Sequence, residues 1–427
     1  MSDTSTPSPD PQADGAAAAT ETLTATKSAP VSSKDRFESL DILRGVAVLG
    51  ILMVNAPTFF YYWGAFEYPP AHMDITGANA DAWRLMTVFF EQKFITIFSA
   101  LFGAGIMLIV GDSADASTKL HYRRMLWLLA FGLVHGFLFW FGDILTAYAL
   151  IGMLAVLFRR MSVLKLVLLG LVGILLTNLL IVANEYATSM APTMLEPTPF
   201  GIVPDDQTLT SWVGAYQSGF WPSRVFNAIG NAIAQLSGII FFGPRVLGVM
   251  LIGMALYKSG FLLARWSLPA YAALAVICLG VGLPALWLAT GPVVETGFAL
   301  ETTAVAGSVN AFASLVVALG YASLVMLIAK IDWLRLLRAP FAAAGRMAFT
   351  NYLTQTFAMV ALATGVFGAP LFGVIERAEL VMLVLAVWLV QLIISPLWLL
   401  VFRFGPFEWL WRCLSYGRFQ PILKAKA

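Results

Sequence analysis

Long apolar segments constrain this chain more than any other feature of its sequence. A membrane-spanning helix needs about 20 mostly apolar residues, at a rise of 1.5 Å per residue. Ten segments of this kind recur along the chain: 42–62, 85–110, 125–141, 144–158, 163–183, 238–257, 268–290, 307–329, 342–364 and 379–402. Only 12% of the residues are charged, against about 25% in soluble domains. We therefore expect an all-α, polytopic integral membrane protein, a bundle of ten transmembrane helices.

The distribution of basic residues supports this count. Cytoplasmic loops of membrane proteins carry an excess of Lys and Arg. When the N-terminus is placed in the cytoplasm, most of the 26 basic residues fall in cytoplasmic segments and the outer loops are acidic. We therefore predict that both termini are cytoplasmic. The expected location is the plasma membrane, which in a bacterium is the inner membrane.

Three parts follow from the sequence pattern. Residues 1–38 are rich in Ser, Thr, Pro and Ala, so we expect a disordered cytoplasmic tail. Residues 39–404 form the transmembrane domain. Within it, 184–237 is a long extracytoplasmic segment whose second half predicts an amphipathic helix at the membrane surface, with a lid over a substrate as the alternative. Residues 405–427 contain Trp and Arg and predict a cytoplasmic C-terminal anchor.

Composition excludes several functional classes. Two cysteines and three histidines provide neither zinc-ligand spacing nor a disulfide framework, so we expect no metal. A net charge of +2 is too balanced for a nucleic-acid binder. The motifs GxxxxGK[ST], GxSxG, HExxH and CxxC are absent. The lipid bilayer is therefore the predicted partner, and a homodimer is left open.

Polar residues within the spans are candidates for function, because placing them in lipid is costly. In the first span, Arg44 and Asn55 lie on one face of a regular helix, about 16 Å apart along its axis. Asp41 precedes Arg44 at a spacing that allows the two side chains to pair. A capped helix start at the cytoplasmic side explains Asp41 and Arg44, but it does not explain Asn55.

Other spans carry further polar residues. In the second span, Glu91 and Lys93 are about 200° apart on a regular helix, so each needs a partner on another span. Arg245 lies near the outer start of the sixth span. The ninth span begins near Arg346, and its polar stripe contains Asn351 and Gln355, for which hydrogen bonding between helices is the simpler explanation.

His135 lies near the middle of the third span, where a neutral imidazole can act as a general base. A packing role is the alternative. Asp143 lies about 12 Å further along the axis of a straight helix. We therefore expect no direct bond between the two, and a turn at the outer interface is the simpler role for Asp143.

Five blocks of residues, in this order, resemble the YeiB-like membrane proteins, which carry a domain of unknown function (number 418) in their C-terminal half. These blocks are Leu40–Gly45 with Asn55, Lys93–Gly105, His135 and Gly136 with Gly142–Leu145, Gly345–Leu353, and Gly405–Arg412. At longer range the layout is similar to the transmembrane acyltransferase superfamily. Its sugar-modifying branch has an Arg, ten residues and then a catalytic His in the first span. Here Arg44 keeps the Arg position and Asn55 stands in place of that His.

The resemblance implies transfer of an acyl group from cytoplasmic acyl-CoA to a hydroxyl or amine of a cell-envelope glycan or lipid, with His135 as the base. We assign the predicted roles as follows: catalysis to His135, Asn55, Asn351, Lys93 and Asp143; donor binding to Arg44, Asp41 and Arg346; substrate contact to Glu91, Arg245 and Gln355. One rival hypothesis is a transporter or flippase for small molecules or lipids that uses the same residues. Another is a scaffold without catalytic activity. Binding of acyl-CoA distinguishes the first hypothesis from both.

Overall fold

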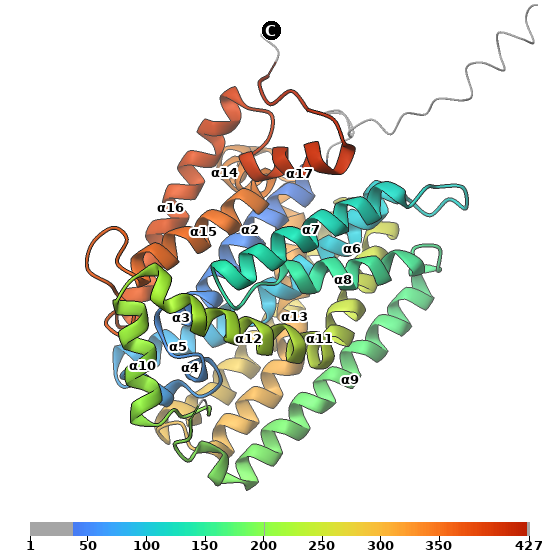
Figure 1. Cartoon of the computed structure of the whole chain (residues 1–427). Coiled ribbons are helices and arrows are strands. Elements are labelled where there is room, and N and C mark those ends of the chain that lie inside the picture. Colours follow the sequence, from blue (N-terminus) through green and yellow to red (C-terminus); the bar gives the residue numbers. More distant parts are fainter. Residues whose placement is uncertain (1–36, 200, 425–427) are drawn as a thin grey trace, which may run out of the picture. The chain divides into compact units, whose positions relative to one another are not determined.

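The computed structural model describes residues 37–199 and 201–424. This part of the chain consists mainly of helices joined by turns and loops, and its β-structure is confined to two isolated bridges (Figure 1). The predicted disordered tail lies outside the described residues, apart from Phe37 and Glu38, and Glu38 already begins the first described helix. The all-α class is confirmed.

Apolar length again dominates the architecture. Seven helical segments of the described residues are long and apolar enough to cross a membrane, and each overlaps a predicted span: Glu38–Phe60, Ala78–Val110, Val163–Met190, Phe220–Lys258, Leu268–Glu295, Leu300–Ala329 and Arg377–Val401. The other three predicted spans form helices that are shorter or more polar: α7 (Lys119–Leu138), α8 (Leu145–Ala155) and α15 (Ala348–Ala363). These seven segments indicate a multi-pass membrane protein. The count of ten spans remains a prediction.

Several predicted spans are interrupted helices. The first is divided into α2 (Glu38–Asn55) and α3 (Pro57–Phe60), and α4 (Gly64–Glu67) follows it. The second consists of α5 (Ala78–Phe89) and α6 (Lys93–Val110). Between them Gln92 has a positive φ of 62°. The remaining long helices are α9 (Val163–Met190), α11 (Phe220–Lys258), α12 (Leu268–Glu295), α13 (Leu300–Ala329) and α16 (Arg377–Val401).

The segment 184–237 differs from the prediction. Its helix α10 (Asp206–Gln217) ends before Gly219, whose φ is 115°. The chain then enters α11, which runs without a break for 39 residues. Arg224 and Asn227 of α11 are buried, so the predicted surface helix is wrong for this stretch: its polar face points into the protein because it binds backbone carbonyl groups there.

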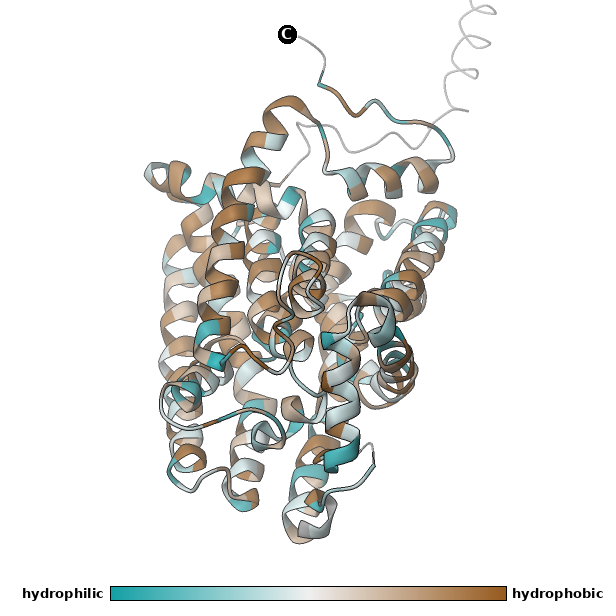
Figure 2. Ribbon diagram, turned by 60° about the vertical axis from the view of Figure 1, so that its left-hand side comes forward, coloured by the Kyte–Doolittle hydropathy of each residue, from teal (hydrophilic) through white to brown (hydrophobic). Residues whose placement is uncertain are grey.

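Helices pack closely where glycine removes the side chain. A Cβ on Gly45 of α2 would lie 1.9 Å from the carbonyl oxygen of Phe341, which belongs to α14 (Arg335–Arg346). A Cβ on Gly103 of α6 would lie 1.9 Å from the carbonyl oxygen of Met250 on α11. The exposed large apolar side chains, in contrast, concentrate on helices such as α9, α12 and α16, and Figure 2 shows that long stretches of the helical ribbon are hydrophobic. These faces are suited to lipid.

Candidate functional site

The centre of the candidate site is a buried pair formed by His135 and Asp143. The Nδ1 atom of His135 lies 2.8 Å from Oδ1 of Asp143, and the two side chains are 2% and 0% exposed. The prediction that the pair cannot bond directly is wrong. It assumed a straight helix, whereas α7 ends at Leu138 and the following turn brings Asp143 back to His135.

Polar side chains of α11 bind the end of α7. The Nη1 atom of Arg224 donates to the carbonyl oxygens of Leu138 and Phe139, at 2.8 and 2.6 Å. The amide of Asn227 donates to the carbonyl oxygens of Gly136 and Phe137. The last carbonyls of a helix have no partner within it, so these side chains make it possible for α7 to end inside the protein.

The turn after α7 also fixes Asp143. The Nε2 atom of Gln235, one turn of α11 further on than Asn231, donates to the carbonyl oxygen of Asp143 at 2.6 Å. The backbone N–H of Thr146 donates to Oδ2 of Asp143 at 2.9 Å. This N–H lies in the first turn of α8, where a carboxylate is favoured by the helix dipole. Asp143 is therefore held as an acceptor facing Nδ1 of His135.

The other ring nitrogen of His135 faces a hydroxyl group. Nε2 lies 3.0 Å from Oγ1 of Thr356 on α15. The ring of Tyr352, one turn earlier on α15, lies 5.3 Å from the imidazole. A carboxylate oxygen beside Nδ1 favours the tautomer with the proton on Nδ1, in which Nε2 is the hydrogen-bond acceptor. Asp143, His135 and Thr356 thus have the order of an acid, a base and a hydroxyl that can transfer a proton to the base.

Asn55 lies near this group. The Nε1 atom of Trp140 donates to Oγ1 of Thr58, and Thr58 donates to the carbonyl oxygen of Asn55. Trp140 in turn lies beside His135, with ring centres 6.3 Å apart. The side-chain amide of Asn55 is half-buried and forms no hydrogen bond to any described residue.

The structure does not bring Asn351 and Gln355 to His135. The amide of Asn351 donates to the carbonyl oxygen of Ala344 and to Oγ of Ser395. Gln355 donates to Oε1 of Gln391 on α16. These side chains join α15 to its neighbours, which is the simpler of the two roles considered for them.

A second buried group contains Glu91, Lys93 and Arg245. The Nζ atom of Lys93 donates to the carbonyl oxygen of Thr87 at 2.6 Å and to Oδ1 of Asn310 on α13 at 2.9 Å. This confirms the prediction of a partner on another span. The carboxylate of Glu91 interacts electrostatically with Lys93 and Arg245. The chain turns between α5 and α6, so the regular-helix argument that separated Glu91 from Lys93 does not apply.

Arg245 belongs to the same interior group. Its Nη1 donates to Oδ1 of Asn178 on α9, and its Nη2 donates to Oγ of Ser314 on α13. Within the described residues, the hydrogen bonds of Lys93 and Arg245 do not reach His135. The predicted role of these cations at the reacting group is therefore not supported by their position.

The predicted cytoplasmic ends of α2, α7 and α17 (Pro406–Tyr416) carry a group of arginines. Arg44 forms an ion pair with Asp41 at 3.1 Å, as the spacing predicted, and its side chain is 30% exposed. The guanidinium groups of Arg412 and Arg44 are close enough to act electrostatically on Arg124. Arg346 instead donates to the carbonyl oxygen of Arg403. Arg44 was assigned to donor binding from the sequence, whereas Arg124, whose guanidinium lies in the field of Arg44 and Arg412, was not.

The C-terminal helix α17 is docked on the bundle. The Nε1 atom of Trp411 donates to the carbonyl oxygen of Arg124, whose guanidinium lies 4.1 Å from the Trp411 ring. The carboxylate of Glu408 accepts from the backbone N–H groups of Phe349 and Thr350. Burial raises the pKa of Glu408. Besides anchoring the C-terminus, α17 therefore caps the start of α15, the helix that carries Thr356.

Comparisons with known proteins now place the chain. Residues 256–418 match the family described as "Protein of unknown function (DUF418)". The uncharacterized protein YeiB of Escherichia coli (strain K12) is 31% identical over 415 residues, which cover 91% of this chain and 98% of YeiB. The chain belongs to the YeiB-like DUF418 family.

Two further relatives in this family have the same extent. The uncharacterized protein YxaH of Bacillus subtilis (strain 168) is 29% identical over 432 residues, which cover 92% of this chain and 98% of YxaH. An uncharacterized 39.9 kDa protein of Bacillus acidopullulyticus is 29% identical over 409 residues, which cover 93% of this chain and 99% of that protein. The match to the YeiB-like proteins therefore extends over the transmembrane region, as the five blocks predicted.

The structure gives the family blocks physical roles. The block around His135 and Asp143 forms the buried pair and the turn that makes it. Gly45 and Gly345 allow α2 and α14 to touch, since a Cβ on Gly345 would lie 1.8 Å from the carbonyl oxygen of Asp41. The C-terminal block supplies Glu408. Thr356 was not identified from the sequence. Its only distinguishing feature there is a hydroxyl group on the span that carries the polar stripe.

Proposed function

We propose that this YeiB-like protein transfers acyl groups from a cytoplasmic acyl-CoA to a hydroxyl or amine acceptor, with His135 as the general base. One observation carries the proposal: His135 is held by Asp143 through Nδ1 while Nε2 faces a hydroxyl at 3.0 Å. The side chain of Thr356 occupies the place where an acceptor hydroxyl would bind. Asp143 orients the imidazole and stabilises its protonated form.

The proposed reaction has two stages. The acceptor oxygen or nitrogen attacks the carbonyl carbon of the thioester, and its proton passes to Nε2 of His135. The tetrahedral intermediate then collapses, the C–S bond breaks, and the CoA sulfur leaves with that proton. Asn55 is the free amide near this site and can donate to the developing oxyanion. Because His135 is 2% exposed, α3 or α15 has to move when the substrates bind.

The donor would bind at the arginine group. Arg44 and Arg124 can contact the phosphates of CoA, because guanidinium groups bind phosphate through paired hydrogen bonds. Asp41 would keep Arg44 in place through the 3.1 Å ion pair. Replacing Arg44 by Ala should weaken donor binding, and Arg44→Lys should restore only part of it, since Lys lacks the planar group.

The test uses the full chain in lipid nanodiscs with acetyl-CoA. We expect the protein to bind acetyl-CoA and to release the CoA thiol, and we expect His135→Ala to stop the release without loss of binding. His121→Asn is the matched control, since His121 lies on the same helix, is buried, and forms its hydrogen bond with the carbonyl oxygen of Gly152, away from His135. Absence of both binding and thiol release in the wild-type protein contradicts the proposal.

The second candidate function is transport of a small molecule. The buried group of Glu91, Lys93 and Arg245 favours it, because charged residues in the interior of a membrane bundle often mark a path for ions or substrates. A transporter moves its solute into vesicles without cleaving a thioester. Uptake that survives His135→Ala and is lost in Lys93→Met would favour this candidate over acyl transfer.

A further inference from the structure

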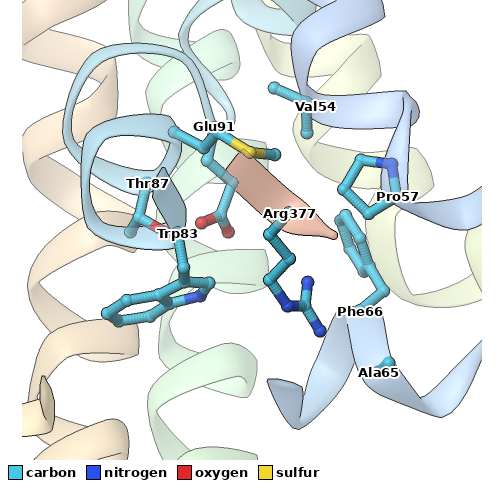
Figure 3. Close-up of a pocket in the computed structure, with 9 residues that line it drawn as sticks. Val54, Pro57, Ala65, Phe66, Trp83, Thr87, Glu91 and Arg377 are labelled. Atoms are coloured by element: carbon cyan, nitrogen blue, oxygen red, sulfur yellow. The ribbon is translucent and has the colours of Figure 1, made fainter. Parts of the chain in front are cut away.

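The pocket between α2, α4, α5 and the start of α16 is too small for an organic ligand. Figure 3 shows Glu91 and Arg377 at its wall. Its volume is about 40 Å³, and a cavity needs about 10–15 Å³ to hold one water molecule. The pocket therefore has room for a few water molecules, and a larger ligand such as a lipid needs a site on the surface of the bundle.

Two very exposed apolar side chains lie close together just before and at the start of α14. Trp333, in the 3-10 helix η5 (Asp332–Leu334), is 81% exposed, and Leu336, in the first turn of α14, is 88% exposed. Both lie outside the predicted spans 307–329 and 342–364, so crossing the membrane does not account for them. An exposed apolar group of this kind indicates contact with a partner or with a membrane.

The other side of this segment is docked on the bundle. Arg338 lies about 200° around a regular helix from Leu336 and is buried. Its Nε forms an ion pair with Glu38 at 3.2 Å, and its Nη1 donates to three backbone carbonyl oxygens at and just beyond the end of α13. Further along α14, Gly345 lets the helix touch α2. The outward apolar side chains therefore belong to a fixed surface.

Unpaired arginines accompany the apolar side chains. Arg335 of α14 and Arg265, on the loop between α11 and α12, are exposed, and their side chains form no hydrogen bond or ion pair among the described residues. The two segments meet, since Nζ of Lys330 donates to the carbonyl oxygen of Trp266 at 2.7 Å. Asp332 is the only acid in these two segments. The surface is therefore positively charged.

The apolar face of α16 continues to this surface. Ala343 and Met347, at the end of α14, pack in one cluster with Leu399 of α16, and the neighbouring Leu400 is 70% exposed. Figure 1 shows α14 at the same end of the molecule as α17, which is the predicted cytoplasmic end. The segment before α14 thus lies where the lipid-facing surface reaches the cytoplasmic headgroups.

We propose that this surface binds an anionic phospholipid of the cytoplasmic leaflet. Trp333 and Leu336 lie at the boundary between headgroups and acyl chains, a position that Trp favours. Arg335 and Arg265 bind the lipid phosphate through paired hydrogen bonds. The apolar side chains accept any lipid, whereas the two arginines favour a headgroup with a net negative charge. The proposal does not rest on acyl transfer, and neither test below uses a thioester.

The first test measures the depth of Leu336 in the bilayer. The full chain carries Cys278→Ala, Cys413→Ala and Leu336→Cys, with a nitroxide spin label on the new thiol, in lipid nanodiscs. We expect the label to lie about 5–10 Å inside the headgroup boundary, so that it collides more often with oxygen than with a water-soluble nickel chelate. Asp115→Cys, at an exposed loop position, and Leu288→Cys, at an exposed apolar position of α12, are the aqueous and the bilayer controls.

Two results of this measurement overturn the proposal. If the Leu336→Cys label meets the nickel chelate as often as the Asp115→Cys label does, the segment is in water. If it is shielded from both reagents, or if labels on two chains broaden each other's spectra, a protein or a second copy of this chain covers the surface.

The second test identifies the headgroup. The purified full chain is titrated with dioleoylphosphatidylglycerol, which is anionic, or with dioleoylphosphatidylcholine, which has the same acyl chains and no net charge. Bound lipids are counted by native mass spectrometry. A basic residue near an anionic lipid surface contributes about fivefold in affinity, so we expect the anionic lipid to bind at least about tenfold more tightly. Equal affinity for the two lipids overturns the proposal.

Variants locate the bound lipid on this surface. Arg335→Gln and Arg265→Gln should each weaken binding of phosphatidylglycerol about fivefold and leave binding of phosphatidylcholine unchanged. Lys119→Gln is the matched control, because Lys119 is also exposed but follows the loop that contains Asp112 and Asp115. A wild-type preference for phosphatidylglycerol in both arginine variants contradicts the assignment. Both side chains are exposed and unpaired, so these substitutions should leave the fold intact.

Discussion

Replacing Asp143 by Asn tests how His135 is oriented. In the wild-type protein Oδ1 of Asp143 lies 2.8 Å from Nδ1 of His135, and Oδ2 accepts from Thr146 at 2.9 Å. Asparagine can keep the bond to Thr146 through its carbonyl oxygen. Its NH₂ group then faces Nδ1, so the imidazole carries its proton on Nε2. In that tautomer Nε2 donates to Thr356 and can no longer take a proton from an acceptor.

The expected effects follow from these contacts. A hydrogen bond to a charged group contributes about 1.5–3 kcal/mol, so Asp143→Asn should lower the free energy of unfolding by no more than that. Turnover should fall by a factor of about 10²–10⁴, the usual contribution of a positioned base. Both are measured together, by thermal unfolding and by release of the CoA thiol from acetyl-CoA.

Two controls make the result specific. Nitrogen-15 spectra of labelled histidine report directly which ring nitrogen carries the proton. Asp112→Asn is the matched substitution, since the Asp112 side chain is 64% exposed and its ion pair with Lys258, at 3.4 Å, lies outside the histidine site. Wild-type turnover in Asp143→Asn, with the Nδ1–H tautomer retained, would refute the proposed role of Asp143.

Three further predictions concern the fold. Gly45→Ala should destabilise the protein by about 1–3 kcal/mol, because the added Cβ would lie 1.9 Å from a carbonyl oxygen of α14. Gly105→Ala is the control: its Cβ meets nothing within 4 Å, so this variant should unfold like wild type. Asn227→Leu should cost about 1–3 kcal/mol in thermal unfolding, since two carbonyls of α7 lose their donor; unchanged stability contradicts this. Burial and the charge of Arg377 lower the pKa of His72 from 6.5 to about 4. Below pH 6.5 the unfolded chain therefore binds a proton that the folded chain does not, and stability should fall from there to about pH 4 in wild type but less in His72→Asn.

The positions of the helices could be predicted because apolar length alone determines them. The runs at 163–183 and 379–402 contain few polar residues, and each is covered by a long helix to within one residue at its C-terminal end or better. The ends of the helices were less predictable. The polar residues of 220–237 resemble a surface helix in sequence, and only the carbonyl groups they bind show that they face inward.

The histidine site shows the same limit. His135 and Asp143 were both identified, but the bond between them depends on where α7 ends. The apolar sequence 125–141 gives no stop signal at Leu138, because the side chains that donate to the last carbonyl oxygens of the helix belong to Arg224 and Asn227, far along the chain. Such contacts between distant segments cannot be read from the periodicity of one span.

The most direct test of the central claim is acyl transfer by His135→Asn. Asparagine can replace a hydrogen-bonding imidazole but cannot accept the proton of the acceptor. The measurement compares wild-type and variant proteins in nanodiscs, with labelled acetyl-CoA as donor and a bacterial envelope extract as the source of acceptors. We expect the transfer rate to fall by a factor of about 10²–10⁴ while the affinity for acetyl-CoA stays the same. Full transfer activity in His135→Asn would contradict the account, because His135 would then be a packing residue.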